Sequence, residues 1–260
     1  MGGKKLFPLL EDVPESWWKK LGQKHIYFGH QSVGYNIVES VKDVLEGNPQ
    51  IKLNIVETNS PGDFSVPIFS HSQIGKNNDP KSKCEAFAHL MEHGIGEGVD
   101  IALLKFCYVD ITRKTDVNRL FTDYSSTINT LKKRYSNVTY VHITVPLSRV
   151  QTDARVWLKK VIGRPIGGYD DNIRRGEYNQ KLRSEYGSNE RLFDLAALES
   201  TFPDGGRHTF SAGGKAYETL VPEYTEDGGH LNQKGRRWVA EQFLCFLANL
   251  SNTGGDSGPP

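Results

Sequence analysis

A near-continuous apolar run, VDIALLKFC at residues 99–107, constrains the fold of this chain more than any other segment. A strand without alternating polar residues is covered on both faces, which is typical of a parallel sheet between two layers of helices. Other strand-like segments alternate along the chain with segments that carry one apolar helical face. The strand-like segments are 24–29, 51–57, 138–145 and 191–195, and the helical ones include 33–45, 82–93, 117–131 and 177–186. This order predicts an α/β fold, a three-layer α/β/α sandwich with a central parallel sheet of about five strands.

We expect one domain over residues 24–250. Residues 1–23 are predicted to be an N-terminal extension. Residues 251–260, SNTGGDSGPP, are predicted to be a disordered tail because they are polar and rich in glycine. Residues 59–80 are rich in Ser, Pro, Gly, Asn and Asp and predict a long loop, whereas residues 149–172 fit no clear pattern. A loop as long as the one predicted at residues 59–80 is usually functional in a compact domain.

The composition argues against several classes of protein. Lys and Arg number 32 and Asp and Glu 31, so the net charge of +1 gives no bulk attraction to nucleic acid. No apolar run approaches the roughly 20 residues that span a bilayer, and the first residues, MGGKKLFPLLED, make a poor signal peptide. Cys84, Cys107 and Cys245 lack the C-x-x-C spacing and predict neither a disulfide framework nor a zinc finger.

The first predicted strand ends in FGHQSVG, residues 28–34, directly before a helix. A serine at a sharp strand-to-helix turn exposes its hydroxyl near the positive end of the helix dipole, which favours developing negative charge. Ser32 is therefore a candidate nucleophile. An extra residue separates it from Gly29, so the strict G-x-S-x-G pattern is absent, and a simple helix N-cap is the alternative.

A second motif, YTEDGGHLNQKG, occupies residues 224–235, before the last predicted helix. Asp227 and His230 lie three residues apart in a turn that contains two glycines. This spacing allows the carboxylate to hold one imidazole nitrogen while the other nitrogen faces a hydroxyl, the arrangement that activates a serine nucleophile. The alternative is a glycine-rich turn in which Asn232 caps the helix. Both motifs are expected at the carboxyl edge of the sheet, where ligands of such folds bind.

Taken together, these blocks resemble the SGNH (GDSL-type) hydrolase superfamily over residues 24–250. The similar segments are FGHQSVG, VDIALLKFCYVDI, YNQKLRSEYGSNERLFDLAAL and DGGHLNQKG. The resemblance implies a flavodoxin-like sandwich with Ser32 as nucleophile, His230 as base and Asp227 as the residue that orients the base. By this resemblance the chain would be an atypical member, because GHQS stands where the family has G-D-S.

The resemblance also implies an oxyanion hole. The family combines the serine N–H, a glycine N–H after the second strand and an asparagine after the third. Gly75, in HSQIGKN, matches the glycine, but residues 105–110 read KFCYVD and contain no asparagine. Tyr108, Lys105, Asn77 or Asn78 is then expected to replace it, since the loss of one donor costs roughly 10²–10³ in rate.

Three further polar residues near this edge are candidates for substrate binding, namely His30, Gln31 and His71. The alternative for the two histidines is a loop position with a backbone partner. Arg149 follows the next strand and is either a contact for an acidic substrate group or a solvated charge.

A competing motif lies elsewhere. Residues 89–93, HLMEH, fit the H-x-x-E-H pattern of inverted zinc peptidases, so His89 and His93 are an alternative metal site. The sequence shows no obvious third ligand helix nearby, which favours surface or core-edge histidines.

The expected function is a serine esterase that hydrolyses an acyl ester, with an O-acetyl group on a carbohydrate as one candidate. The expected partner is a small-molecule or glycan ester, without nucleic acid or a membrane span, and the chemistry needs no cofactor or metal. An acyltransferase and a catalytically weak, glycan-binding relative remain alternatives on the same fold.

Overall fold

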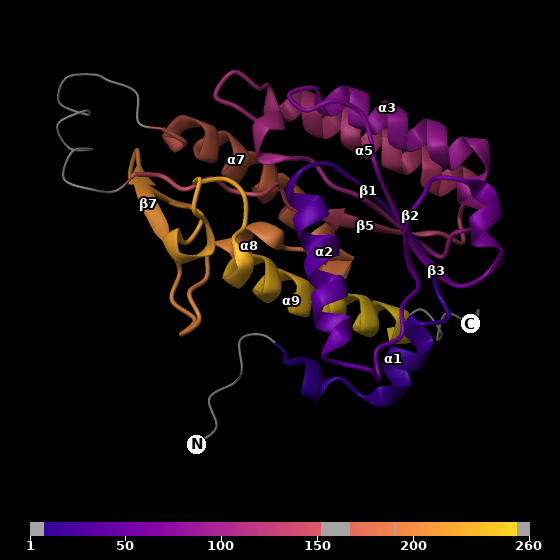
Figure 1. The fold of residues 1–260 in the computed structure, drawn as a ribbon. Coiled ribbons are helices and arrows are strands. Elements are labelled where there is room, and N and C mark those ends of the chain that lie inside the picture. The colour runs from indigo at the N-terminus through magenta and orange to yellow at the C-terminus, as the bar shows by residue number, and fades with distance from the viewer. Residues whose placement is uncertain (1–7, 152–166, 190, 254–260) are drawn as a thin grey trace.

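The computed structural model describes residues 8–151, 167–189 and 191–253, which form a six-stranded sheet between two layers of helices (Figure 1). The strand order is β2-β3-β1-β4-β5-β6, and each neighbouring pair is parallel. The strands are β1 (His25–His30), β2 (Ile55–Glu57), β3 (Ile68–Gln73), β4 (Ile101–Leu104), β5 (Thr139–Ile143) and β6 (Leu192–Phe193). This architecture confirms the predicted α/β/α sandwich, with six strands in place of about five.

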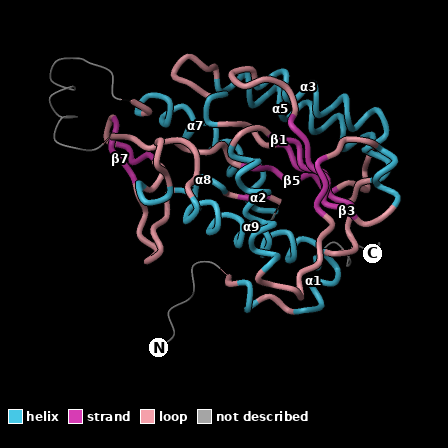
Figure 2. The backbone as a smooth tube through the Cα atoms, viewed as in Figure 1, coloured by secondary structure: helices cyan, strands magenta, loops and turns pink. Residues whose placement is uncertain are grey.

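The helices fall into two groups, one on each face of the sheet (Figure 2). One face carries α1 (Glu15–Leu21), α2 (Val33–Glu46) and α9 (Gln233–Thr253), and the other carries α3 (Pro80–Leu90), α5 (Val117–Arg134) and α7 (Tyr169–Tyr186). Shorter elements are α4 (Gly96–Gly98), α8 (Leu195–Glu199) and the antiparallel hairpin of β7 (Thr209–Ala212) and β8 (Lys215–Glu218). None of the helices in these described ranges is both long and apolar enough to cross a membrane.

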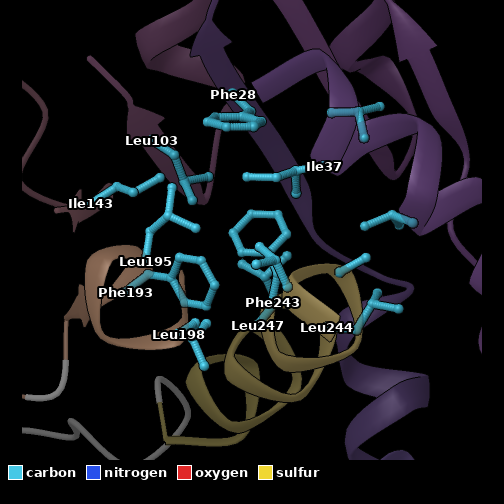
Figure 3. Packing of buried hydrophobic residues seen from close by; sticks show 14 of the residues in the cluster. Phe28, Ile37, Leu103, Ile143, Phe193, Leu195, Leu198, Phe243, Leu244 and Leu247 are labelled. Carbon is cyan, nitrogen blue, oxygen red and sulfur yellow. The ribbon is translucent and has the colours of Figure 1, made fainter. Parts of the chain in front are cut away.

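Apolar packing fixes α2 and α9 against the sheet, and these are the two helices that begin next to the candidate motifs. Phe28 of β1, Ile37 of α2 and Phe243 of α9 belong to one buried cluster (Figure 3). The rings of Phe28 and Phe243 lie 5.8 Å apart between centroids. Burial of such large side chains stabilises the fold by about 1.5–3 kcal/mol each, so this cluster holds both helices against the sheet.

The predicted long loop at residues 59–80 contains β3, which the sequence did not indicate. This strand lies between β1 and β2, and its polar residues Ser70, His71 and Ser72 are buried. Each of them has a partner there. Ser70 Oγ donates to the Thr58 carbonyl, His71 Nδ1 lies 3.0 Å from His30 Nε2, and Ser72 Oγ lies 2.8 Å from Tyr27 Oη. Since the buried positions are polar, the alternation that normally reveals a strand is missing.

The structure describes most of the predicted N-terminal extension but only the first residues of the predicted tail. Within the segment expected to be an extension, α1 buries Trp18 and Leu21 in the same core cluster as α9. Residues 254–260 of the expected tail and residues 152–166 of the segment without a clear pattern lie outside the described residues.

Candidate active site

Ser32 lies two residues after the end of β1 and immediately before the first residue of α2, at the carboxyl edge of the sheet. Its backbone has φ 47° and ψ −107°, a conformation that non-glycine residues rarely adopt and that costs of order 1–3 kcal/mol. Its side chain makes no capping hydrogen bond to α2, so the simple N-cap alternative does not describe its role. The turn instead directs the hydroxyl towards the loop before α9.

The structure brings together the three residues of the predicted triad. Ser32 Oγ lies 2.7 Å from His230 Nε2, and His230 Nδ1 lies 2.6 Å from Asp227 Oδ2. The other oxygen of Asp227 accepts hydrogen bonds from the backbone N–H groups of Gly229 and His230, both at 2.8 Å. Asp227 thus fixes both the imidazole and the turn that carries it.

The charge on Asp227 is stabilised by these contacts. Desolvation acts to raise the pKa of Asp227, but the hydrogen bonds from the His230 ring and from the two backbone N–H groups outweigh it and hold the pKa well below its usual range. The side chains of His230 and Asp227 are 45% and 58% exposed, so water and a substrate reach the site. This is the geometry of a general base that is held by a carboxylate and faces a hydroxyl.

Gly75, the predicted oxyanion glycine, lies beside the turn between β1 and α2. The amide of Gln31 donates to the carbonyls of Ile74 and Gly75 at 3.3 and 3.1 Å, and Ile74 N donates to the carbonyl of His30 at 3.0 Å. Within the described ranges, no hydrogen bond uses the backbone N–H of Ser32 or of Gly75. Both N–H groups are therefore free to donate to a developing oxyanion, as an oxyanion hole requires.

Tyr108 lies beside His230, in the loop after β4 where the expected asparagine is missing. Its ring meets the ring of His230 edge-on at 5.7 Å, and its hydroxyl packs against Gly229, where a Cβ would come within 2.7 Å of it. Desolvation, then the charge of Asp227, raises the pKa of Tyr108, so the hydroxyl keeps its proton. Arg175 lies over the ring and donates to the Tyr108 carbonyl at 2.9 Å.

His30, His71 and Lys105, predicted to reach a substrate, are fully buried. His30 Nε2 lies 3.0 Å from His71 Nδ1, and burial, with the charges of His71 and Lys105, lowers the pKa of His30 to about 2. Lys105 Nζ donates to the Phe106 carbonyl at 3.0 Å. The structure therefore places these three side chains in the layer beneath the site and not on its open surface.

The remaining candidates have other positions. Asn77 accepts a hydrogen bond from Lys83 Nζ, and Asn78 N donates to Asp110. Arg149 is exposed, and its backbone N donates to the carbonyl of Gly228 at 2.8 Å. Gln31 supports the Gly75 segment through its amide, which is a positioning role.

The zinc alternative lacks a ligand set. His89 lies in the last turn of α3 and His93 in the π-helical segment Met91–Ile95 that follows. Their ring centroids are 3.8 Å apart, and His93 Nδ1 donates to the carbonyl of His89. Over residues 8–151, 167–189 and 191–253 there is no group of three His, Cys, Asp or Glu side chains that could hold a metal ion.

Two polar hollows flank the triad. One, of about 550 Å³, is lined by Ser148, Arg149, Asp227 and Gly228, and the other, of about 480 Å³, by His230, Asn232 and Arg236. A more apolar hollow of about 510 Å³ lies between the N-terminal segment and α9, and none of the triad residues lines it. The polar hollows are the better candidates for substrate binding because Asp227 lines both of them and His230 lines the second.

Some structurally important residues had no signal in the sequence. Lys83, Asp110 and Arg175 are all buried, and they connect the loops that carry Gly75 and Tyr108. Charged residues on a helix or in a loop are usually solvated, and only the fold shows that these three are not.

No protein-family model matches the chain, and no curated protein is significantly similar to it in sequence. Among solved structures, an inferred acylhydrolase from Bacteroides fragilis is similar with a TM-score of 0.55 and 13% identity over 88% of each chain. The esterase EstA from Pseudoalteromonas sp. is similar with a TM-score of 0.50 and 10% identity over 88% of this chain and 99% of that one. At these identities the likeness is one of fold, and the chain shares the α/β/α fold of these two structures.

Proposed function

We propose that this protein is a serine ester hydrolase with Ser32 as nucleophile, His230 as general base and Asp227 as the residue that orients the base. The observation that carries the proposal is the continuous chain of hydrogen bonds from Ser32 Oγ to His230 Nε2 at 2.7 Å and from His230 Nδ1 to Asp227 at 2.6 Å. The strained backbone of Ser32 supports it, because such strain persists where a function requires it.

The reaction follows from this geometry. His230 Nε2 takes the proton of Ser32 as Oγ attacks the acyl carbonyl, and Asp227 stabilises the imidazolium. The tetrahedral intermediate then expels the alcohol, which receives the proton from His230 and leaves an acyl group on Ser32. Water gives a proton to His230 and attacks the acyl-enzyme, and collapse of the second intermediate returns that proton to Ser32 and releases the acid.

The backbone N–H groups of Ser32 and Gly75 would hold the oxyanion. We assign the third donor to the hydroxyl of Tyr108, which lies in the loop where the asparagine is missing and whose raised pKa keeps it protonated. A donor aimed at the developing charge is worth roughly 10²–10³ in rate.

The substrate that fits best is an ester with a polar alcohol part, such as an O-acetylated sugar, because both hollows beside the triad are mainly polar. An acyltransferase would use the same residues, with a sugar hydroxyl in place of water. The exposure of His230 favours hydrolysis, since nothing among the described residues keeps bulk water from the base.

The test is labelling with a fluorophosphonate probe, together with a screen of acetylated sugars and short p-nitrophenyl esters. Wild type is expected to react at Ser32, identified by peptide mass, and both Ser32→Ala and His230→Ala are expected to lose turnover. Release of acetate without an added acceptor identifies the hydrolase. An unlabelled wild type, or a Ser32→Ala variant that is still labelled, contradicts the proposal.

A further inference from the structure

Two opposite charges that the triad does not use are completely buried between the loops that carry Gly75 and Tyr108. The side chains of Lys83 in α3 and Asp110 after β4 have no exposed surface, and Lys83 Nζ donates to Asp110 Oδ2 at 2.5 Å. Burial of two charges carries a desolvation penalty that their attraction repays only with additional hydrogen bonds. The additional hydrogen bonds of Lys83 and Asp110 therefore show which segments the pair connects.

Asp110 is the acceptor for three groups from different segments. Its Oδ1 accepts from Asn78 N at 2.9 Å, in the loop that begins with Gly75. Its Oδ2 accepts from Cys107 N at 2.6 Å, the residue before Tyr108, and from Lys83. One carboxylate thus joins the loop after β3 to the loop after β4.

Lys83 extends the connection to Gly75 itself. Its ammonium group also donates to Asn77 Oδ1 at 3.0 Å. Its backbone packs so closely on Gly75, where φ is +57°, that a Cβ there would lie 2.6 Å from Lys83 N. The pair therefore contacts residues 75–78 through the Lys83 backbone, the Lys83 ammonium group and the Asp110 carboxylate.

We propose that the Lys83–Asp110 pair is a positioning device that holds the loop carrying the Gly75 N–H and the loop carrying the Tyr108 hydroxyl in place relative to each other. This inference rests on the proposed function. Without the carboxylate, the N–H groups of Asn78 and Cys107 lose their acceptor, and both loops shift to find another. A displacement of about 1 Å at a reacting centre is enough to cost roughly 10²-fold in rate.

The test compares Asp110→Asn, Lys83→Met and the double variant with wild type. The matched control is Asp194→Asn, which breaks the bidentate pair with Arg183 at the edge strand β6, away from the triad. Turnover of p-nitrophenyl acetate is normalised to the sites that a fluorophosphonate probe titrates. Hydrogen exchange at residues 74–78 and 106–111 is measured in parallel, because it reports on the loops independently of activity.

We expect Asp110→Asn to lower kcat by about 10- to 100-fold, with KM within threefold of wild type. The double variant leaves no unpaired charge, so its melting temperature is expected to exceed that of Asp110→Asn while its kcat stays low. Exchange in the two loops is expected to rise in all three variants, whereas Asp194→Asn is expected to keep the wild-type kcat and loop exchange.

The inference is overturned if kcat per titrated site recovers together with stability in the double variant, or if loop exchange is unchanged. If wild type is not labelled at Ser32, the proposed function fails, and loop exchange alone then decides whether the pair holds these two loops in place.

Discussion

The backbone strain at Ser32 leads to a prediction that separates the elbow geometry from the hydroxyl. At φ 47° and ψ −107° an alanine keeps the strain, whereas a glycine relieves it. Both substitutions remove the hydroxyl and its hydrogen bond to His230, so the difference between Ser32→Gly and Ser32→Ala isolates the backbone term.

The magnitude follows from two opposing effects. A non-glycine residue in a sparsely populated region costs of order 1–3 kcal/mol in the folded state. A glycine variant loses about 0.4–1 kcal/mol of folding stability relative to alanine, because its unfolded chain has more conformational freedom. Ser32→Gly is therefore expected to be more stable than Ser32→Ala by about 1 kcal/mol, or roughly 2–4 °C in Tm for a chain of this size.

Urea unfolding followed by tryptophan fluorescence, with equal m-values, measures the difference. Tyr35, an exposed residue in the first turns of α2, supplies the control, because there glycine is expected to be less stable than alanine by up to about 1 kcal/mol. A Ser32→Ala variant that equals or exceeds Ser32→Gly in stability refutes the claim that the turn is strained.

Three further predictions concern the site and its surroundings. Tyr108→Phe removes the assigned third oxyanion donor and is expected to lower kcat by roughly 10²-fold with little change in Tm, as measured by steady-state kinetics and thermal melting. Asp227→Asn leaves the His230 Nδ1–H without a charged acceptor, so kcat is expected to fall by roughly 10³-fold or more while ester binding persists, which kcat and KM report separately. Burial raises the pKa of Glu199 to about 8, against the opposing effect of the Leu147 N–H and the charges of Lys105 and Arg175. The native state then binds a proton that the unfolded chain, with a pKa of about 4.3, has released, so the free energy of unfolding is expected to fall between about pH 5 and 8. Glu199→Gln is expected to flatten this pH dependence in urea titrations, and an unchanged slope contradicts the assignment.

The parts of the site that sequence predicts best are those whose residues lie close together in the chain. Asp227 and His230 are three residues apart, so one turn suffices to place the carboxylate on the imidazole. Ser32 follows a strand that reads clearly as apolar. Strand β3 was hidden because Ser70 and His71 occupy its buried positions with partners that only the fold provides.

The residues whose positions the sequence failed to predict share a common physical cause. A polar residue near the end of a strand points either to the open edge or into the layer beneath it, and the sequence does not distinguish the two. His30 and Lys105 were expected at the edge and lie in that buried layer. The Lys83–Asp110 pair joins positions 27 residues apart, and no local pattern reveals such a connection.

The two motifs depend on one another through a helix pair. Ser32 precedes α2 and the turn of Asp227 and His230 precedes α9, and these helices pack side by side. His230 and Asp227 lie on the same turn, so they move together. A shift of one helix along the other therefore changes one distance of the triad, that between Ser32 Oγ and His230 Nε2. Substitutions at Ile37 or Phe243, which are buried where these helices pack, are therefore expected to change the distance between the hydroxyl and the imidazole. Screens for altered turnover should include this helix interface as well as the surface of the site.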